Sequence, residues 1–492
     1  MLPLLSLVLV TLAAGTAVTF AAGARARWAA LATSLAFLAE VALLFVDYTG
    51  WPGYAGSPLV PGFAEQESHA WIHLSWLQVS YTVGVDGISL VLILLTAILQ
   101  VATVVYSWAE PRRPGAYFGL VLLTCLGSFG VFVALDVLLF FLFWEAVLVP
   151  MFFLIGFWGG PRRRYAALKF FVYTHVASIV MLVGLLATVF YSGATSLDFS
   201  AVDASARTLS SVDQSFLFLA LFFGFGVKFP IVPFHTWLPD AHVEAPTGGS
   251  VLLAGLLLKL GGYGLIRWGV EVLPTGFVHD RPILFAVAFA SIVWGSVVSL
   301  AQRDLKRLIA FSSINHMGIV LLAIALDSSL GLLAAVLLMF AHGIVSALLF
   351  MTAGSFHHTF GTRDLASVGG ITPTTPALST MVMAGSLASL GLPALIGFPA
   401  EFTALLATWY GLGYWVFVPL GILVVTAAFY LWMMQRVLFG PPRAIPPAAH
   451  DLSLPEGLGM GILAALTVLF GILPGLLVNV ITSSPVHGFP GP

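Results

Sequence analysis

The sequence predicts a single all-α polytopic membrane domain with about 14 transmembrane helices, and three observations support this fold class. Of the 492 residues, 60% are hydrophobic and only 8% are charged, whereas a soluble globular protein has roughly 25% charged residues. Apolar windows of about 20 residues, long enough to cross a ~30 Å hydrocarbon core, recur along the whole chain. The basic residues also segregate between alternate loops, as expected for a fixed membrane topology.

The first three predicted spans cover residues 2–22, 28–46 and 86–108 and form an N-terminal segment, residues 1–110. The first span lacks a basic leader and a small-residue cleavage site, so we expect a retained helix. The gap between the second and third spans, Asp47 to Asp86, is the longest in the chain. Its alternating stretch, Trp71 to Val83, predicts a short hairpin.

The next five spans form a predicted first repeat, residues 115–268. The seventh span of the chain is interrupted near its middle, where Pro230 and Pro233 follow Lys228. Proline removes a backbone donor and clashes with the preceding turn, so this helix is expected to break. Lipid cannot satisfy the exposed backbone groups, which must face protein or a hydrated cavity. The five spans are residues 115–134, 137–158, 166–190, 215–236 and 248–268.

Five further spans form a predicted second repeat, residues 282–437, and a last helix covers residues 458–481. The twelfth span is interrupted between Gly391 and Glu401, with Pro399 just before the glutamate. Broken spans five helices apart are typical of an inverted-repeat transporter. The alternative is that the prolines merely kink two long helices. The five spans are residues 282–301, 306–326, 330–354, 376–408 and 413–437.

The distribution of basic residues predicts the topology. Fourteen of the 19 lysines and arginines fall in alternate loops on one side, and only Arg207, Arg267 and Arg281 fall on the other. The positive-inside rule places the basic side in the cytoplasm. The chain is therefore expected in a bacterial-type inner (plasma) membrane with both termini on the non-cytoplasmic side.

Five ionisable residues lie inside predicted spans: Glu40, Glu145, Lys228, Lys259 and Glu401. Each costs at least ~2.5 to 3.5 kcal/mol at the bilayer centre, so its retention indicates a use. The alternative, buried ion pairs that fix helix register, often brings no net stability. Glu40 has no proline break or polar companion, and an interhelical hydrogen bond is the favoured explanation for it.

Histidines add titratable groups along the same path. His316 and His342 share helix faces with serines, which makes these faces polar enough to hold water. His235 and His242 flank the exit of the seventh span. Each of the four could instead be a hydrogen-bonded packing residue.

Two other sites favour structural explanations. Asp136 stands at the start of the fifth span, where a helix cap is favoured over a relay role. His357 and His358 are adjacent and point to different helix faces, so we expect a solvated loop rather than a metal site.

These residues predict a proton relay, because they form a mid-membrane series of titratable groups bounded by two broken helices. Cys125 is the single cysteine and cannot supply an iron–sulfur cluster. No nucleotide-binding fingerprint occurs, and the net charge of −2 gives no sign of nucleic-acid binding. We therefore expect no cofactor and no metal in this chain. The predicted relay is Glu145, Lys228, Lys259, His316, His342 and Glu401; the secondary candidates are His235, His242 and Asp136; the predicted helix breaks are at Pro230, Pro233 and Pro399.

Long combined motifs carry a resemblance that covers almost the whole chain. They are residues 143–150 with the glycines at 159–160, residues 227–242, residues 245–264, residues 303–318, and His342-Gly343. In these motifs the chain resembles the antiporter-like membrane subunits of respiratory complex I, a family shared with Mrp cation/proton antiporters and membrane-bound hydrogenases. Glutamate at position 401 resembles the M-type subunit, related to the fourth mitochondrially encoded subunit, because the L-type and N-type subunits typically have lysine there.

The resemblance implies roles for individual residues. Glu145 and Lys228 would be the paired glutamate and lysine of spans five and seven, Lys259 the central lysine of span eight, and Glu401 the terminal residue of the path. One departure is that alanine and an additional proline occupy residues 392–400, where glycine is common in the family.

The resemblance also implies a function. The chain would be a proton-translocating membrane-arm subunit of an NADH:quinone oxidoreductase, a translocase subunit without a redox centre of its own. Its partners would be the lipid bilayer and the L-type and N-type subunits, with flavin, iron–sulfur clusters and quinone in other subunits. The alternatives are a subunit of an Mrp-type antiporter or of a membrane-bound hydrogenase, and a membrane cytochrome with histidine pairs ligating haem.

Overall fold

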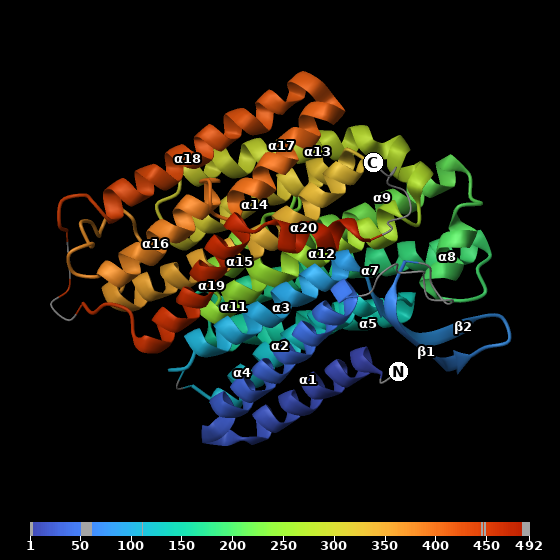
Figure 1. Ribbon diagram of the computed structural model, residues 1–492, viewed down its shortest axis with the longest axis horizontal. Helices are drawn as coiled ribbons and strands as arrows, with labels where there is room; N and C mark the ends of the chain where they lie inside the picture. The colour runs from blue at the N-terminus through green and yellow to red at the C-terminus, as the bar shows by residue number, and fades with distance from the viewer. Residues whose placement is uncertain (1–2, 51–61, 111, 444–445, 447–448, 485–492) are drawn as a thin grey trace.

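The computed structural model describes residues 3–50, 62–110, 112–443, 446 and 449–484 (Figure 1). The described chain is a bundle of roughly parallel and antiparallel helices with one two-stranded hairpin at an end. The proline-rich residues 51–61 of the long gap lie outside the described residues. In chain order the elements are α1 (Leu4–Ala21), η1 (Gly23–Arg25), α2 (Ala26–Gly50), β1 (Ala64–His73), β2 (Gln78–Val85), α3 (Gly87–Tyr106), α4 (Pro114–Val133), α5 (Val137–Ala146), α6 (Leu148–Trp158), α7 (Arg163–Ser192), α8 (Phe199–Ala206), α9 (Ser211–Lys228), α10 (Trp237–Glu244), α11 (Thr247–Leu252), η2 (Leu253–Leu257), α12 (Leu258–Gly264), η3 (Leu265–Val270), α13 (Pro274–Leu300), α14 (Leu305–Ala325), α15 (Ser329–Phe360), α16 (Pro376–Ser389), α17 (Gly397–Leu412), η4 (Gly413–Val416), α18 (Phe417–Val437), α19 (Leu454–Ile472) and α20 (Gly475–Thr482).

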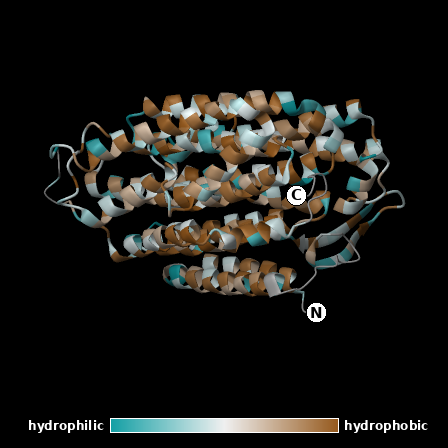
Figure 2. Ribbon diagram, turned by 45° about the horizontal axis from the view of Figure 1, so that its top comes forward, coloured by the Kyte–Doolittle hydropathy of each residue, from teal (hydrophilic) through white to brown (hydrophobic). Residues whose placement is uncertain are grey.

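The prediction of an all-helical polytopic membrane protein is confirmed. Among the described residues, 13 helical segments are long and apolar enough to cross a membrane. One of them, residues 397–437, contains both α17 and α18, which the sequence predicted as two spans. The predicted twelfth span consists of α16 and α17, and the predicted thirteenth span is α18. Figure 2 shows hydrophobic colour over most of the helices and hydrophilic colour mostly towards their ends.

Four segments form the centre of the bundle: α3, the run from α11 to η3, α14 and α15. In an 18-residue apolar stretch of each, between 89% and 100% of the residues are buried. The helices α1, α2, α7 and α13 surround them and expose apolar side chains to the outside. This division matters for function, because a charged group on the central segments is shielded from lipid by protein on every side.

Polar caps fix where several helices begin. Asp86 accepts a hydrogen bond from the backbone N–H of Ser89 and starts α3 with a capping box. Asp136 accepts from the N–H groups of Leu138 and Leu139 and starts α5. The cap predicted for Asp136 is therefore confirmed, since these bonds satisfy donors that the helix itself leaves unpaired.

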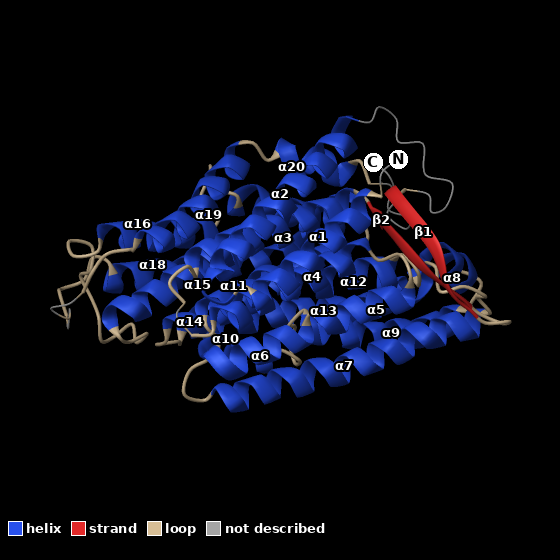
Figure 3. Ribbon diagram, turned by 90° about the horizontal axis from the view of Figure 1, so that it is seen from below, coloured by secondary structure: helices blue, strands red, loops and turns tan. Residues whose placement is uncertain are grey.

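The predicted hairpin is present, but it begins earlier than expected. Strands β1 and β2 pair antiparallel from Ala64↔Val85 to His73↔Gln78, so pairing starts at residue 64 rather than 71. Figure 3 shows the hairpin at one end of the bundle. Glu67 on β1 accepts hydrogen bonds from the backbone N–H groups of Leu5 and Ser6, at 2.9 and 3.1 Å, and so caps α1.

The loops that carry most basic residues gather at the opposite end of the bundle. Arg363 donates to the carbonyl of Val243, and Arg162 lies 3.6 Å from Glu244. Trp158 donates to the carbonyl of Arg112 at the same end. We call this the basic end; it contains the loops that the charge distribution assigned to one side.

Candidate functional site

The fifth span is broken as well as the seventh and twelfth. Helix α5 ends at Ala146 and α6 begins at Leu148, with a turn at Val147. Pro150 has no N–H to donate to the carbonyl of Ala146 four residues earlier, which explains the interruption. Glu145 lies in the last turn of α5, directly before this break.

Glu145 pairs with a histidine that the sequence analysis did not identify. Its Oε2 lies 2.9 Å from Nδ1 of His175 on α7. Its Oε1 is buried and has no hydrogen-bond partner within the described chain. The two side chains are 22% and 41% exposed, so this pair lies on the outer part of the bundle. The lone histidine in the long apolar helix α7 was the available signal.

Lys228 is the last residue of α9, where the break of the seventh span begins. Its ammonium lies 3.9 Å from the ring centroid of Trp144 and donates to the carbonyl oxygen of Trp144 at 3.2 Å. A cation is favoured here because the carbonyls of a helix C-terminus are partly negative. Lys228 is therefore held by the residue before Glu145, and its nearest polar partner is a backbone carbonyl.

Lys259 occupies the centre of the bundle. It lies on α12 between two π-helical turns, η2 and η3, a rare geometry that is frequent at functional sites. Its Nζ donates to the carbonyl of Ala254 and lies 2.8 Å from Nδ1 of His342 on α15. A Cβ added at Gly262 would lie 2.6 Å from Sδ of Met339, so glycine allows α15 to approach this closely.

His342 and His316 continue the path from Lys259. Their ring centroids are 5.4 Å apart. Nδ1 of His316 lies 2.7 Å from the carbonyl oxygen of Ser312, a geometry that suits Nδ1–H as donor and turns Nε2 away from Ser312. A cavity of about 10 Å³ is lined by His316, His342 and Glu401, which is room for about one water molecule.

Glu401 ends this series. Its Oε1 lies 3.3 Å from Nε2 of His316, and both side chains are 5% exposed. The break of the twelfth span runs between α16 and α17, and Pro399 lies in the first turn of α17, just after it. Gly391 within the break has φ +74°, and a Cβ there would lie 2.4 Å from Oε2 of Glu401, so only glycine fits. Ala394 has φ +72°, a strained conformation for a residue with a side chain.

The other two histidines lie beside this series. Nε2 of His235 accepts from Nε1 of Trp294 at 3.0 Å. The ring of His242 stacks on Phe350 with centroids 4.3 Å apart, and neither of its nitrogens has a partner among the described residues. A buried imidazole of this kind is suited to hydrogen bonding with water.

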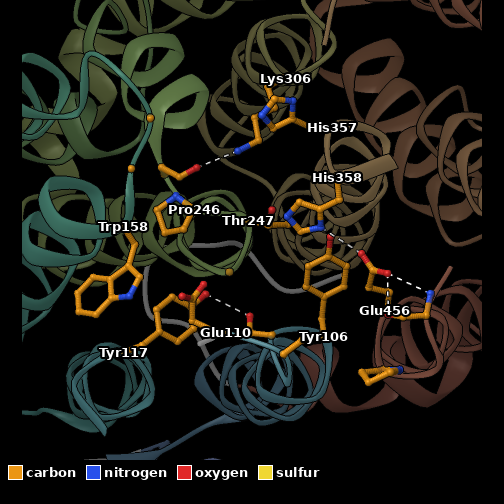
Figure 4. Close-up of a pocket in the computed structure, with 18 of the residues that line it drawn as sticks. Tyr106, Glu110, Tyr117, Trp158, Pro246, Thr247, Lys306, His357, His358 and Glu456 are labelled. Atoms are coloured by element: carbon orange, nitrogen blue, oxygen red, sulfur yellow. Dashed lines mark hydrogen bonds and ion pairs between the residues drawn. The ribbon is translucent and has the colours of Figure 1, made fainter. Parts of the chain in front are cut away.

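A cavity of about 520 Å³ opens at the basic end. Side chains from several elements surround it, among them Glu110, Lys306, His358 and Glu456 (Figure 4). Lys306 is buried, donates to the carbonyl of Ala245 at 2.8 Å and lies 3.5 Å from the hydroxyl of Ser250. Ser250 in turn donates to the carbonyl of His242 at 3.1 Å. The cavity thus leads towards the central segments.

Three remaining predictions can be compared with the structure. Glu40 accepts a hydrogen bond from Thr11 of α1 at 2.7 Å, so the predicted interhelical bond is present. Burial raises the pKa of Asp136, at the cap of α5, to about 6. His357 and His358 lie in the last turn of α15 rather than in a loop; His358 pairs with Glu456 at 3.2 Å. No cluster of three or more metal-ligating side chains occurs in the described ranges.

Comparisons with known proteins agree with one another. The family described as "NADH:quinone oxidoreductase/Mrp antiporter, TM" matches residues 134–429. The F(420)H(2) dehydrogenase subunit M of Methanosarcina mazei is 39% identical, covering 92% of each chain. The NADH-quinone oxidoreductase subunit M of Rhodobacter capsulatus is 39% identical over 95% of this chain and 91% of its own. A chain of respiratory complex I from Thermus thermophilus with bound NADH superposes with a TM-score of 0.85, at 25% identity, over 98% of this chain and 100% of that one.

Proposed function

The chain belongs to the antiporter-like membrane subunits of the NADH:quinone oxidoreductase/Mrp antiporter family, in the M-type branch, and from this we propose how it moves protons. The proton passes through Lys259, His342, His316 and Glu401. One observation carries the proposal: these four side chains are each buried and form a series of contacts. Consecutive members lie close enough for transfer directly or through one water molecule.

The cavity at the basic end is the proposed uptake side. It is lined by carboxylates and histidines and reaches Lys306, which lies 3.5 Å from the hydroxyl of Ser250, and that hydroxyl donates to the carbonyl of His242. In this proposal the basic end faces the cytoplasm and both termini lie on the other side of a bacterial-type inner membrane, because basic loops favour the cytoplasmic side. The break between α16 and α17, beside Glu401, is the proposed exit.

The proposed relay must work against the membrane potential. One charge moved against ~150 mV costs ~3.5 kcal/mol, at ~2.3 kcal/mol per 100 mV. This energy would come from redox chemistry in partner subunits. It would reach this chain as a change of charge near Lys228. Glu145 and Lys228 are the proposed receivers, since they lie at two of the three helix breaks. In this proposal residues 115–268 and 282–437 form two inverted repeats. Lys259 belongs to the first repeat, and His316, His342 and Glu401 belong to the second.

The partner subunits determine which molecule donates electrons to the complex. We propose that the chain serves in an NADH:quinone oxidoreductase beside L-type and N-type subunits, with flavin, iron–sulfur clusters and quinone bound elsewhere in the complex. The equal identity to a subunit of an F(420)H(2) dehydrogenase favours that enzyme as the second candidate. Purification of the native complex and identification of its peripheral subunits separates the two, and also separates both from an Mrp-type antiporter or a hydrogenase.

The relay is tested by replacing Lys259 with methionine. The purified complex is reconstituted in liposomes, and quinone reduction and proton uptake are measured together. We expect Lys259→Met to lower proton translocation by at least about tenfold, a loss of ~1.4 kcal/mol or more of transition-state stabilisation. Lys169→Met is the matched control, because Lys169 has its own partner, Asp240, at 2.7 Å at the basic end. Proton pumping by Lys259→Met at the control's rate would refute the relay.

A further inference from the structure

Two side chains on one face of helix α7 form hydrogen bonds to two consecutive residues of α5. His175 contacts Glu145 at 2.9 Å, and the hydroxyl of Ser178 accepts from Nε1 of Trp144 at 3.0 Å. Positions 175 and 178 are three apart and therefore lie on the same side of a helix. Since Trp144 holds the ammonium of Lys228 through its ring and carbonyl, α7 contacts Glu145 directly and is linked to Lys228 through Trp144.

The His175–Glu145 pair can change its charge without changing its geometry. When Nδ1–H donates to the ionised carboxylate of Glu145 and Nε2 is unprotonated, the pair carries one negative charge. Protonation at Nε2 forms one N–H bond and makes the pair neutral, while the hydrogen bond at 2.9 Å persists. Nε2 has no protein hydrogen bond among the residues that the structure describes, and the imidazole is 41% exposed.

We propose that His175 is a positioning residue that orients Glu145 and carries the proton that switches the charge of this pair, and thereby the charge of Lys228. This inference deepens the proposed function and rests on it. A negative pair favours the ammonium of Lys228, and a neutral pair favours loss of a proton from its Nζ. The proton reaches Nε2 from the exposed side of the imidazole. No redox step takes place at the pair.

Few other charged groups face His175. On α9 there is Lys228, and on α7 itself Lys169, which is paired with Asp240 of α10. The break after α9 contributes His235, whose Nε2 is bonded to Trp294. Helix α6 has no titratable residue. On α8, Asp203 pairs with Arg207 at 2.9 Å. Glu145 is the charged side chain that contacts His175 directly, at 2.9 Å.

The test compares variants of the assembled complex in liposomes across a pH series. His175→Gln keeps a hydrogen-bond donor but cannot be protonated; His175→Lys keeps a permanent positive charge beside Glu145. His279→Gln is the matched control, because His279 also lies beside an acid, Asp280 at 3.1 Å, but is far more exposed. Quinone reduction and thermal stability of each complex are measured alongside pumping to exclude misfolding.

For the wild type and the control we expect the rate of pumping to depend on pH through protonation of the His175–Glu145 pair. That dependence is expected to vanish in both His175→Gln and His175→Lys, with at least a threefold loss of pumping in each, because one variant fixes the pair as negative and the other as neutral. The double variant Glu145→Gln/His175→Gln is expected to pump within about twofold of Glu145→Gln alone, since His175 acts through Glu145.

Two results would separate failure of this inference from failure of the proposed function. An unchanged pH profile in His175→Gln, together with loss of pumping in Lys259→Met, would overturn the role of His175 alone. Normal pumping by Lys259→Met would overturn the relay itself, and normal pumping by Glu145→Gln would overturn the role of His175, because His175 acts through Glu145. A pH profile that shifts equally in the His279→Gln control would also count against His175, because the effect would then not depend on the pair with Glu145.

Discussion

The two lysine regions of the bundle use different kinds of contact. Around Lys259, titratable side chains touch one another in a buried series that ends at Glu401. Around Lys228, the lysine meets a carbonyl and an aromatic ring, while Glu145 turns to His175 on a partly exposed face. The first arrangement is suited to passing a proton along. The second is suited to controlling whether Lys228 keeps its proton, because the charge of the His175–Glu145 pair acts on the ammonium through space.

The largest expected effect comes from interrupting the buried series. His316→Phe keeps an aromatic ring, although a larger one, and removes the nitrogens that link His342 to Glu401 among the described side chains. We expect proton pumping to fall by on the order of 100-fold, ~2.7 kcal/mol. The measurement is proton uptake into liposomes during quinone reduction. If His316→Phe kept more than half the wild-type pumping, the buried series would not be the conducting region.

A smaller loss is expected at the end of the series. Glu401→Gln keeps the shape and a hydrogen bond to His316 but can no longer be ionised. We expect about a tenfold loss of pumping, ~1.4 kcal/mol, because water near the break can replace part of the function. Glu40→Gln is the control, because Glu40 lies outside both the series and the cavity at the basic end and accepts a hydrogen bond from Thr11. Equal losses in the two variants would indicate a general structural effect.

In the Lys228 region, the effect of one side chain should be more modest. Trp144→Leu removes the ring under the ammonium but leaves the backbone carbonyl that accepts its hydrogen bond. Loss of ~1 kcal/mol of cation–π attraction would change pumping by about fivefold. The pH dependence of pumping should shift together with the rate. A loss as large as that of His316→Phe would mean that the two regions do not differ as described.

The smallest effect concerns stability alone. Ala394 adopts φ +72° in the break before Glu401. Glycine adopts such a conformation without the cost of ~1 to 2 kcal/mol that a side chain brings, although it loses more entropy on folding. Ala394→Gly should therefore stabilise the protein by up to ~1 kcal/mol without altering pumping. The midpoint of thermal unfolding of the purified complex is the measurement, and a lower midpoint would contradict this explanation.

The sequence predicted the positions of the buried ionisable residues better than it predicted the groups that contact them. Spans, breaks and buried charges follow from hydrophobic length, proline and the cost of a charge in lipid, all of which are local properties. The helix cap at Asp136 and the interhelical hydrogen bond of Glu40 could be predicted for the same reason. The break at Val147 could have been read from Pro150 as well.

The partners could not be derived in this way. Lys228 binds the backbone carbonyl of Trp144, and every residue has such a carbonyl, so no residue type marks it. Glu145 meets His175 only because α7 packs beside α5 with one particular rotation. These contacts depend on how helices far apart in sequence are rotated against one another, which spacing along a single helix does not determine.

The cap of α1 also has a consequence for assembly of the chain during synthesis. Two N–H groups in the first turn of α1 are satisfied by Glu67, which lies more than 60 residues later on β1. That carboxylate can reach α1 only after α2 and residues 51–67 have been synthesised. Helix α1 is thus completed later than its place in the chain suggests, because a chain that ends before residue 67 leaves these two N–H groups without the carboxylate that caps them.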